Sequence, residues 1–295
     1  MLWIFTTLVA AGAQTARNAM QSSLTATLGT LGATQVRFIY GLPFAIVFLA
    51  VAAAVARTPV PTPGAAFFLY TGGGALAQIA GTALLLAAMQ ARSFSVATTF
   101  TKTEAVQVAI FGVVLLGEQL TLAGMIAIVI ATAGVVLVAA KPGLKLGGAG
   151  MRPVLYGIAS GGGFALASVG FRGGILALGD DAYYLRAATT LVWSLSFQAL
   201  LLGAWMAVFR RRALLDSFAL WRQSLVAGFF GAFASQFWFL GYSLTAAANV
   251  KALGLVEVVF AQVVTQRVFA QQVTTREAAG MGLVVAGVAL LLLAI

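Results

Sequence analysis

Long apolar runs, separated by short polar or turn-rich breaks, fill this chain from end to end. A helix that spans a bilayer needs about 20 mostly apolar residues. Of the 295 residues, 61% are hydrophobic and only 8% are charged, whereas about 25% of an ordinary soluble domain is charged. Such a chain could not keep its surface in water. This composition excludes a soluble globular enzyme, a nucleic-acid-binding domain and a disordered chain, and it predicts an integral membrane protein.

Ten membrane-spanning helices account for almost the whole length. The predicted spans of the first half are 2–24, 35–56, 66–90, 93–116 and 122–140. Those of the second half are 153–175, 182–208, 222–243, 246–268 and 277–295. We therefore expect an all-α integral membrane protein with little chain outside the bilayer. No basic residue precedes the first apolar run, so we do not expect a cleaved signal peptide.

The two halves of the sequence repeat one another. Residues 95–121 align without gaps on residues 248–274, which places Glu104 on Glu257. Each half has an odd number of spans, so the second half would enter the membrane upside down relative to the first. We expect one membrane domain made of two five-helix inverted repeats, at 1–145 and 146–295. Inverted repeats are a signature of secondary transporters.

Lys and Arg residues are unevenly distributed between the predicted loops. One side of the membrane carries only Arg57, together with Asp180, Asp181 and Glu118. The other side carries Arg92, Lys141, Lys145, Arg152, Arg210, Arg211, Arg212, Arg222, Arg267 and Arg276. The positive-inside rule puts this second side in the cytoplasm and both chain termini outside. We interpret the net charge of +10 as a determinant of orientation, and we expect localisation in a bacterial inner membrane.

Short motifs at corresponding places in the two halves resemble the drug/metabolite transporter superfamily, in its EamA-like branch. They are Gln35-Val36-Arg37-Phe38, Gly117-Glu118-Gln119-Leu120-Thr121, Tyr184-Leu185-Arg186-Ala187 and Ala270-Gln271-Gln272-Val273-Thr274. Gln271 stands where the family usually has a glutamate, and we interpret the junction glutamate Glu118 as structural. The resemblance implies a central cavity lined by spans one to four and six to nine. Spans five and ten would brace the outside of this basket.

Small residues recur every four positions in the two bracing spans. Helix backbones can approach closely where such residues face each other. The alternative is ordinary apolar filling in an alanine-rich chain. The predicted seam comprises Ala123, Ala127 and Ala131 with Ala278, Gly282 and Ala286.

Ionisable residues are rare near the centres of the spans, where each costs at least ~2.5 kcal/mol. Glu104 and Glu257 are central in spans 93–116 and 246–268, and Lys102 and Lys251 lie near them. Lys102 and Glu104 lie on nearly opposite faces of one helix. We therefore expect pairing between helices, of Lys102 with Glu257 or of Lys251 with Glu104. These charges either bind a polar substrate or a coupling proton, or form a structural ion pair.

Uncharged polar and aromatic side chains complete the candidate site. Amides both donate and accept hydrogen bonds, which suits a zwitterionic or hydroxylated solute, although they also join helices. An aromatic-rich wall in span 222–243 would suit apolar or aromatic amino acids, or would only pack. The predicted substrate-binding residues are Gln14, Gln78, Lys102, Glu104, Gln107, Gln236, Trp238, Tyr242, Asn249, Lys251 and Glu257. For Arg17, Arg37, Arg172 and Arg186, near span ends, we expect snorkelling to lipid headgroups.

The leading hypothesis is a secondary transporter, by family most often an exporter, of small organic metabolites, with amino acids as the expected substrates. The alternatives are a carrier of phosphate-bearing anions held by Lys102 and Lys251, a channel, and an intramembrane enzyme. The chain has no Cys and no His, and we expect no cofactor, metal or catalytic site. No non-helical segment at membrane depth is evident, which argues against a channel. The expected partners are the solute, the lipid bilayer and a coupling proton, with no nucleic acid, and we expect a monomer.

Overall fold

The computed structural model describes residues 1–90, 100–139, 152–260 and 274–294. Within these ranges the regular structure is helical and no strand occurs. Seven of the described helices are long and apolar enough to cross a membrane, and a shorter apolar helix covers Glu104–Leu116. This confirms the predicted all-helical, multi-pass membrane protein. The count of ten spans and the inverted repeat stay predictions.

The predicted span boundaries agree closely with the long helices. For six predicted spans, both ends lie within two residues of the ends of an observed helix. These spans are 66–90, 122–140, 153–175, 182–208, 222–243 and 277–295. The corresponding helices are α2 (Ala65–Gln90), α5 (Leu122–Ala139), α6 (Arg152–Leu176), α7 (Tyr183–Phe209), α9 (Trp221–Leu244) and α12 (Thr275–Leu293). Apolar runs of this length, bounded by polar or turn-forming residues, define such helices well.

The chain packs as two compact units, and each unit combines segments from both halves of the sequence. Unit 1 consists of Met1–Leu76 with Gly170–Thr245. Unit 2 consists of Ala77–Val169 with Ala246–Ile295. The two predicted repeats, 1–145 and 146–295, describe symmetry within the sequence and differ from these packing units. They stay a prediction.

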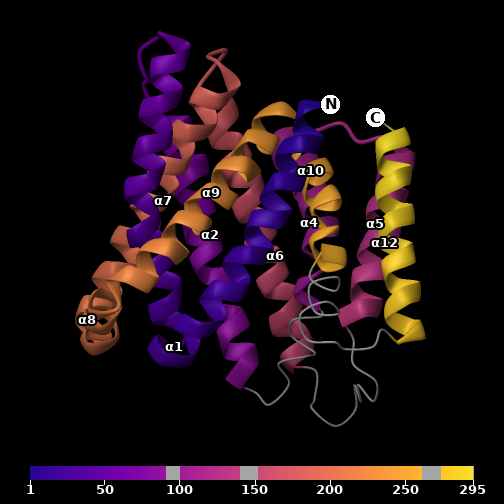
Figure 1. Cartoon of the computed structure of the whole chain (residues 1–295). Coiled ribbons are helices and arrows are strands. Elements are labelled where there is room, and N and C mark those ends of the chain that lie inside the picture. Colours follow the sequence, from indigo (N-terminus) through magenta and orange to yellow (C-terminus); the bar gives the residue numbers. More distant parts are fainter. Residues whose placement is uncertain (91–99, 140–151, 261–273, 295) are drawn as a thin grey trace. The chain divides into compact units, whose positions relative to one another are not determined.

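Unit 1 is built on α1 (Leu2–Ala56), which packs against α7, α8 and α9 (Figure 1). The helix is interrupted at Gly29, whose φ of 67° and ψ of 173° are non-helical. Only glycine adopts this backbone conformation without strain. The two predicted spans 2–24 and 35–56 are therefore joined by a glycine kink rather than by an extended loop.

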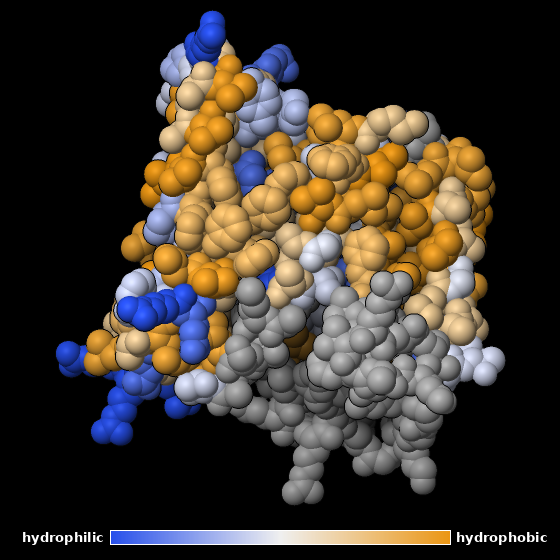
Figure 2. Space-filling model, viewed as in Figure 1, coloured by the Kyte–Doolittle hydropathy of each residue, from blue (hydrophilic) through white to orange (hydrophobic). Residues whose placement is uncertain are grey.

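A short helix, α8 (Arg211–Ala219), follows the arginine-rich break that the sequence predicts as a connection. It carries Arg211 and Arg212 beside Leu214, Leu215 and Phe218. A helix with this mixture of basic and apolar residues is typical of a membrane interface. Figure 2 shows apolar side chains over much of the face in view and hydrophilic side chains gathered around α8.

Aromatic rings fill the contact between the second part of α1 and α9. Phe44 lies 5.2 Å from Phe229, and Phe48 lies 6.5 Å from Phe233, as measured between ring centroids. At Gly228, a Cβ atom would lie only 2.6 Å from the backbone of Tyr40. Here the absence of a side chain brings the two helices into close contact, as small residues do in membrane proteins.

Unit 2 contains the close pair α5 and α12, which lie side by side (Figure 1). A Cβ atom at Gly287 would lie 2.6 Å from the backbone nitrogen of Ala131, and one at Gly134 would lie 2.6 Å from the carbonyl oxygen of Gly280. Ala127 and Ala131 are buried in this seam, as the sequence predicts.

The predicted face of α12 is wrong. Ala278, Gly282 and Ala286 are exposed, and the buried face consists of Gly280, Val284, Gly287 and Leu291. Ala278 and Gly282 each lie two residues from Gly280, which is about 200° around a helix of 3.6 residues per turn, so the predicted residues lie on the opposite side of α12. The alternation of four and three residues in the observed face follows the helix period.

Candidate functional site

Two predicted spans, 93–116 and 246–268, are interrupted by tight turns beside their central glutamates. In the first, residues 102–103 form a turn before α4 (Glu104–Leu116). In the second, residues 255–256 form a turn after α10 (Ala247–Gly254). The two turns are related by the 153-residue offset of the sequence repeat. The remaining parts of these two predicted spans, 93–99 and 261–268, lie outside the described residues.

Both turns are tightened by backbone hydrogen bonds between residues three apart. The N–H of Thr103 donates to the carbonyl of Phe100, and that of Val256 donates to the carbonyl of Leu253. A stretch of this kind within a helix often marks a hinge or local strain. The expectation that nothing departs from regular helix at this depth is therefore wrong for these two spans.

Two ion pairs cross between these interrupted spans. Nζ of Lys102 lies 3.0 Å from Oε1 of Glu257, and Nζ of Lys251 lies 2.7 Å from Oε1 of Glu104. The sequence predicts pairing between helices as alternatives, and the structure contains both pairs. All four residues belong to unit 2.

The four charges form a neutral, partly accessible cluster. The side chains of Lys102 and Glu257 are 36% and 16% exposed, and those of Lys251 and Glu104 are each 21% exposed. Glu104 is the first residue of α4, where the positive end of the helix dipole stabilises a carboxylate. The cluster thus retains charged groups that a polar solute or a proton can reach.

Gln107 joins the first turn to α6. Its Nε2 donates to Oγ1 of Thr103 at 2.9 Å and to the carbonyl of Ile158 at 3.2 Å. A Cβ atom at Gly161 would lie 3.0 Å from Nε2 of Gln107. The glycines of α6 thus allow close packing against the turn.

The other predicted site residues of unit 2 lie on α10 and α2. Asn249 is buried on α10, two residues before Lys251, and Gln78 is half-buried on α2. The N–H of Ala247, the first residue of α10, donates to Oε1 of Glu118 at 3.4 Å. This contact supports the structural interpretation of Glu118, while its counterparts Gln271 and Gln272 lie outside the described residues.

Unit 1 holds the remaining predicted site residues, Gln14, Gln236, Trp238 and Tyr242. Nε1 of Trp238 donates to Oε1 of Gln14 at 3.0 Å, which links α9 to α1. Oε1 of Gln236 is buried and has no hydrogen-bond partner within the described part of the chain. Tyr242 is buried, and its backbone carbonyl accepts a hydrogen bond from Arg172.

The four arginines near span ends make contacts within the protein, and their expected snorkelling stays a prediction. Arg172 donates to the carbonyl of Tyr242, and Arg186 donates to the carbonyl of Gly179 at 2.6 Å. The side chains of Arg17 and Arg37 lie against Gly231, in the middle of α9. A helix interior without bulky side chains gives arginine stems a place to pack, and this competes with extension toward the headgroups.

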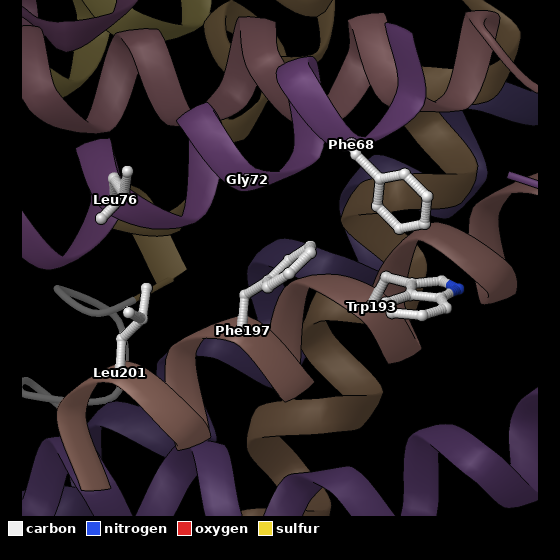
Figure 3. A pocket seen from close by; sticks show the side chains of 6 residues that line it. All are labelled: Phe68, Gly72, Leu76, Trp193, Phe197 and Leu201. Atoms are coloured by element: carbon white, nitrogen blue, oxygen red, sulfur yellow. The ribbon is translucent and has the colours of Figure 1, made fainter. Parts of the chain in front are cut away.

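An apolar groove of about 460 Å³ lies between α2 and α7 in unit 1. Figure 3 shows its six lining residues, Phe68, Gly72, Leu76, Trp193, Phe197 and Leu201. A metabolite site combines apolar walls with a few placed polar groups, and this groove has apolar lining residues throughout. We therefore assign it no part in metabolite recognition.

Among the described residues, no group of three or more His, Cys, Asp or Glu side chains could hold a metal ion. The charged cluster contains two carboxylates and two ammonium groups. Its chemistry therefore suits binding of polar or charged solutes by ion pairing and hydrogen bonding.

Comparison with known proteins agrees with the fold. Residues 1–140 match the EamA-like transporter family. A solved structure described as "Crystal structure of protein" superimposes with a TM-score of 0.76, covering 99% of this chain and 97% of that chain at 17% sequence identity. At that identity the likeness shows the fold alone. A comparison with curated proteins gives no match.

These findings confirm the resemblance that the short motifs indicate, to EamA-like transporters of the drug/metabolite transporter superfamily. The described helices are those of a multi-pass integral membrane protein, and the family match over residues 1–140 suggests a transporter of small molecules. Proteins of this family are transporters rather than enzymes.

Proposed function

We propose that the protein is a secondary transporter that exports small organic metabolites, with amino acids, including aromatic ones, as its substrates. The observation that carries this proposal is the pair of crossed ion pairs beside two tight helix turns in unit 2. Ionisable groups within membrane spans are expensive and usually functional. Interrupted helices near the membrane centre are also where transporters of this general type bind solutes.

A zwitterion has the chemistry needed to exchange with these ion pairs. Its ammonium group would replace a lysine beside Glu104 or Glu257, and its carboxylate would replace a glutamate beside Lys102 or Lys251. Each protein–protein pair would then be exchanged for protein–solute pairs of the same kind, so no charge is left unpaired. Binding would loosen the link between the two turns, and the turns supply a place for the helices to bend.

A proton is the proposed coupling ion. Protonation of Glu104 or Glu257 would release the paired lysine, just as binding of an ammonium group would. Competition of proton and solute for one carboxylate is a simple way to couple their movements.

The phosphate-anion alternative is less well supported. Lys102 and Lys251 each lie at contact distance from a glutamate, so the positive field that would attract a phosphate is cancelled. An anionic substrate would have to displace a carboxylate from each lysine.

The arrangement in the membrane is also part of the proposal. We propose ten spans in two inverted repeats, 1–145 and 146–295, around a central cavity, with alternating access by movement of the repeats. The matched positions of the two tight turns support this symmetry. Monomeric state, export direction, outward-facing termini and a bacterial inner membrane rest on the family resemblance and the positive-inside rule.

Counterflow in liposomes tests the proposal. Purified protein would be loaded with one member of a panel of amino acids, sugar phosphates and neutral metabolites, and uptake of a labelled member would be measured. We expect exchange of amino acids, and loss of exchange in Glu104→Gln and Glu257→Gln. Asp180→Asn makes the same chemical change at an exposed residue and should leave exchange intact.

Two results would overturn the proposal. Full exchange in both glutamate variants would remove the charged cluster from the mechanism. Exchange of sugar phosphates with no exchange of amino acids would favour the anionic alternative.

A further inference from the structure

A cationic surface lies where the chain passes from the membrane span α7 through α8 to the span α9, in unit 1. Residues 205–229 contain four arginines, one aspartate and no other charged residue, so positive charge is in excess. The aspartate is Asp216, on α8. The arginines all have exposed side chains, and they are Arg210, Arg211, Arg212 and Arg222. Figure 2 shows these hydrophilic surroundings of α8 beside a largely apolar face.

One exposed face of α8 combines a basic side chain with two apolar ones. Arg211, Leu215 and Phe218 recur at intervals of four and three residues, so they lie on the same side of the helix. Leu215 is 55% exposed and Phe218 is 47% exposed, whereas Ser217 is buried. Such a face can place its apolar side chains among the upper parts of acyl chains while the guanidinium stays among headgroups.

Hydrogen bonds hold α8 in this orientation. The hydroxyls of Tyr40 and Ser224 both donate to the carbonyl of Ser217, at 3.3 Å and 3.2 Å. Tyr40 belongs to α1 and Ser224 to α9, so α8 is attached to both helices. The ring centroid of Tyr40 also lies 6.2 Å from that of Phe218. The exposed face is therefore formed before any ligand binds, which lowers the entropic cost of binding.

Exposed aromatic side chains indicate that this surface lies at the level of the membrane interface. Trp205 and Phe209 end α7, and Trp221 begins α9; they are 42%, 66% and 52% exposed. Tryptophan near the ends of spans is typical of the headgroup region. The guanidinium of Arg222 lies 5.4 Å from the ring centroid of Trp221. This contact uses the face of the guanidinium rather than its N–H donors, which lie in its plane.

We propose that α8 and the start of α9 form a binding surface for anionic phospholipid. The phosphate of a headgroup accepts paired hydrogen bonds from a guanidinium, and its negative charge complements the four arginines. The positive-inside rule predicts that this connection faces the cytoplasm, where anionic lipids give the leaflet a negative surface potential. A zwitterionic lipid carries an additional cation, which the arginines would repel. This binding would occur whether or not the transported solute is an amino acid.

Lipid binding to the purified protein in a neutral detergent tests the assignment. The probes are phosphatidylglycerol and phosphatidylcholine with the same acyl chains, and native mass spectrometry measures the bound lipid. We expect phosphatidylglycerol to bind about tenfold or more tightly, and Arg211→Gln to weaken its binding about fivefold. Arg57→Gln removes an exposed arginine at the end of α1 and should bind phosphatidylglycerol as the unmodified protein does.

Two combined variants separate charge from folding. Replacement of Arg210, Arg211 and Arg212 by glutamine should abolish the preference for phosphatidylglycerol. Replacement of the same three residues by lysine keeps the charges, so most of the preference should return, and it should decline as salt is added. Leu215→Ser/Phe218→Ser keeps every arginine and should weaken the binding of both lipids, because the apolar contacts are lost. All variants should elute as the unmodified protein does in size-exclusion chromatography.

Several results would overturn the assignment. Equal binding of the two lipids, or a preference that survives the triple glutamine variant, would remove the arginines from lipid recognition. A triple lysine variant that binds no better than the glutamine variant would exclude charge as the cause. Displacement of phosphatidylglycerol by an equimolar amount of inorganic phosphate would identify a free anion as the ligand. Exchange of amino acids by a protein without this preference would refute the lipid surface and leave the proposed function intact.

Discussion

Lys251, which precedes one tight turn, is paired with Glu104, which follows the other, at 2.7 Å between Nζ and Oε1. The relationship is reciprocal, because Lys102 is paired in the same way with Glu257. Each interrupted helix therefore depends on the other for the neutralisation of its charges. A substitution of any one of these four residues should therefore alter the structure of both turns.

Removal of one partner should destabilise the protein more than removal of a complete pair. Lys251→Met leaves the carboxylate of Glu104 without its partner, and we expect a loss of about 2 kcal/mol, since the pair is mostly buried but not dry. In the double variant Lys251→Met/Glu104→Gln most of this stability should return while exchange stays low. Thermal unfolding in detergent and counterflow would measure the two effects. A double variant as unstable as the single one would contradict the pairing.

Exchange of charges tests the second pair. Lys102→Glu alone brings two carboxylates together, and Glu257→Lys alone brings two ammonium groups together, so each should lower the yield of folded protein. The combined variant restores opposite charges and should be recovered at a higher yield than either single variant. Size-exclusion chromatography provides the measurement, and equal yields from all three variants would argue against a direct contact.

Much of this site can be predicted from sequence, because the free-energy cost of placing charged side chains in lipid is large. Because a bare carboxylate is costly in lipid, Glu104 and Glu257 are expected to have a cation or a proton as partner. The opposite helix faces of Lys102 and Glu104 argue against pairing within one helix. The tight turns are harder to predict. Along the sequence, Gly254 is the only glycine directly beside either turn. The first turn contains Thr103, whose Oγ1 donates to the carbonyl of Phe100. Such local bonds compete with the helix ladder without a clear sequence signal.

The seam between α5 and α12 provides a matched test of packing. Gly287→Ala would place a Cβ atom 2.6 Å from the backbone of Ala131, which should force the helices apart at a cost of about 1–3 kcal/mol. Gly282→Ala, on the same helix, meets no atom within 4 Å and should be neutral or slightly stabilising. Apparent melting temperatures in detergent would compare the two. Equal shifts would contradict the observed register of α12.

The hydrogen bond between Gln107 and Thr103 should stabilise the first turn. Its loss in Gln107→Leu or Thr103→Val should cost about 1 kcal/mol, and the double variant should cost less than the sum of the two. A double-mutant cycle on apparent stability, together with exchange rates, would show whether the same bond also limits transport. Strict additivity of the two substitutions would indicate that the side chains act independently.

Errors in the sequence interpretation have a common physical origin. The positions of Ala278, Gly282 and Ala286 suit a seam, but sequence does not reveal which of two small-residue faces meets a partner. Likewise, Arg17 and Arg37 are near span ends in the chain, and only the Gly29 kink brings them together at Gly231. Both features depend on tertiary contacts, for which one sequence contains no direct signal.

The contacts that hold unit 2 together have a consequence for how the polypeptide can be made. The two ion pairs, the hydrogen bond from Gln107 to Ile158, the bond from Ala247 to Glu118 and the α5–α12 seam all join residues before 140 to residues after 151. None of these contacts requires the chain to be covalently continuous between residues 140 and 151. Two separately translated fragments, divided in that interval, should therefore recognise each other in the bilayer and reconstitute the transporter.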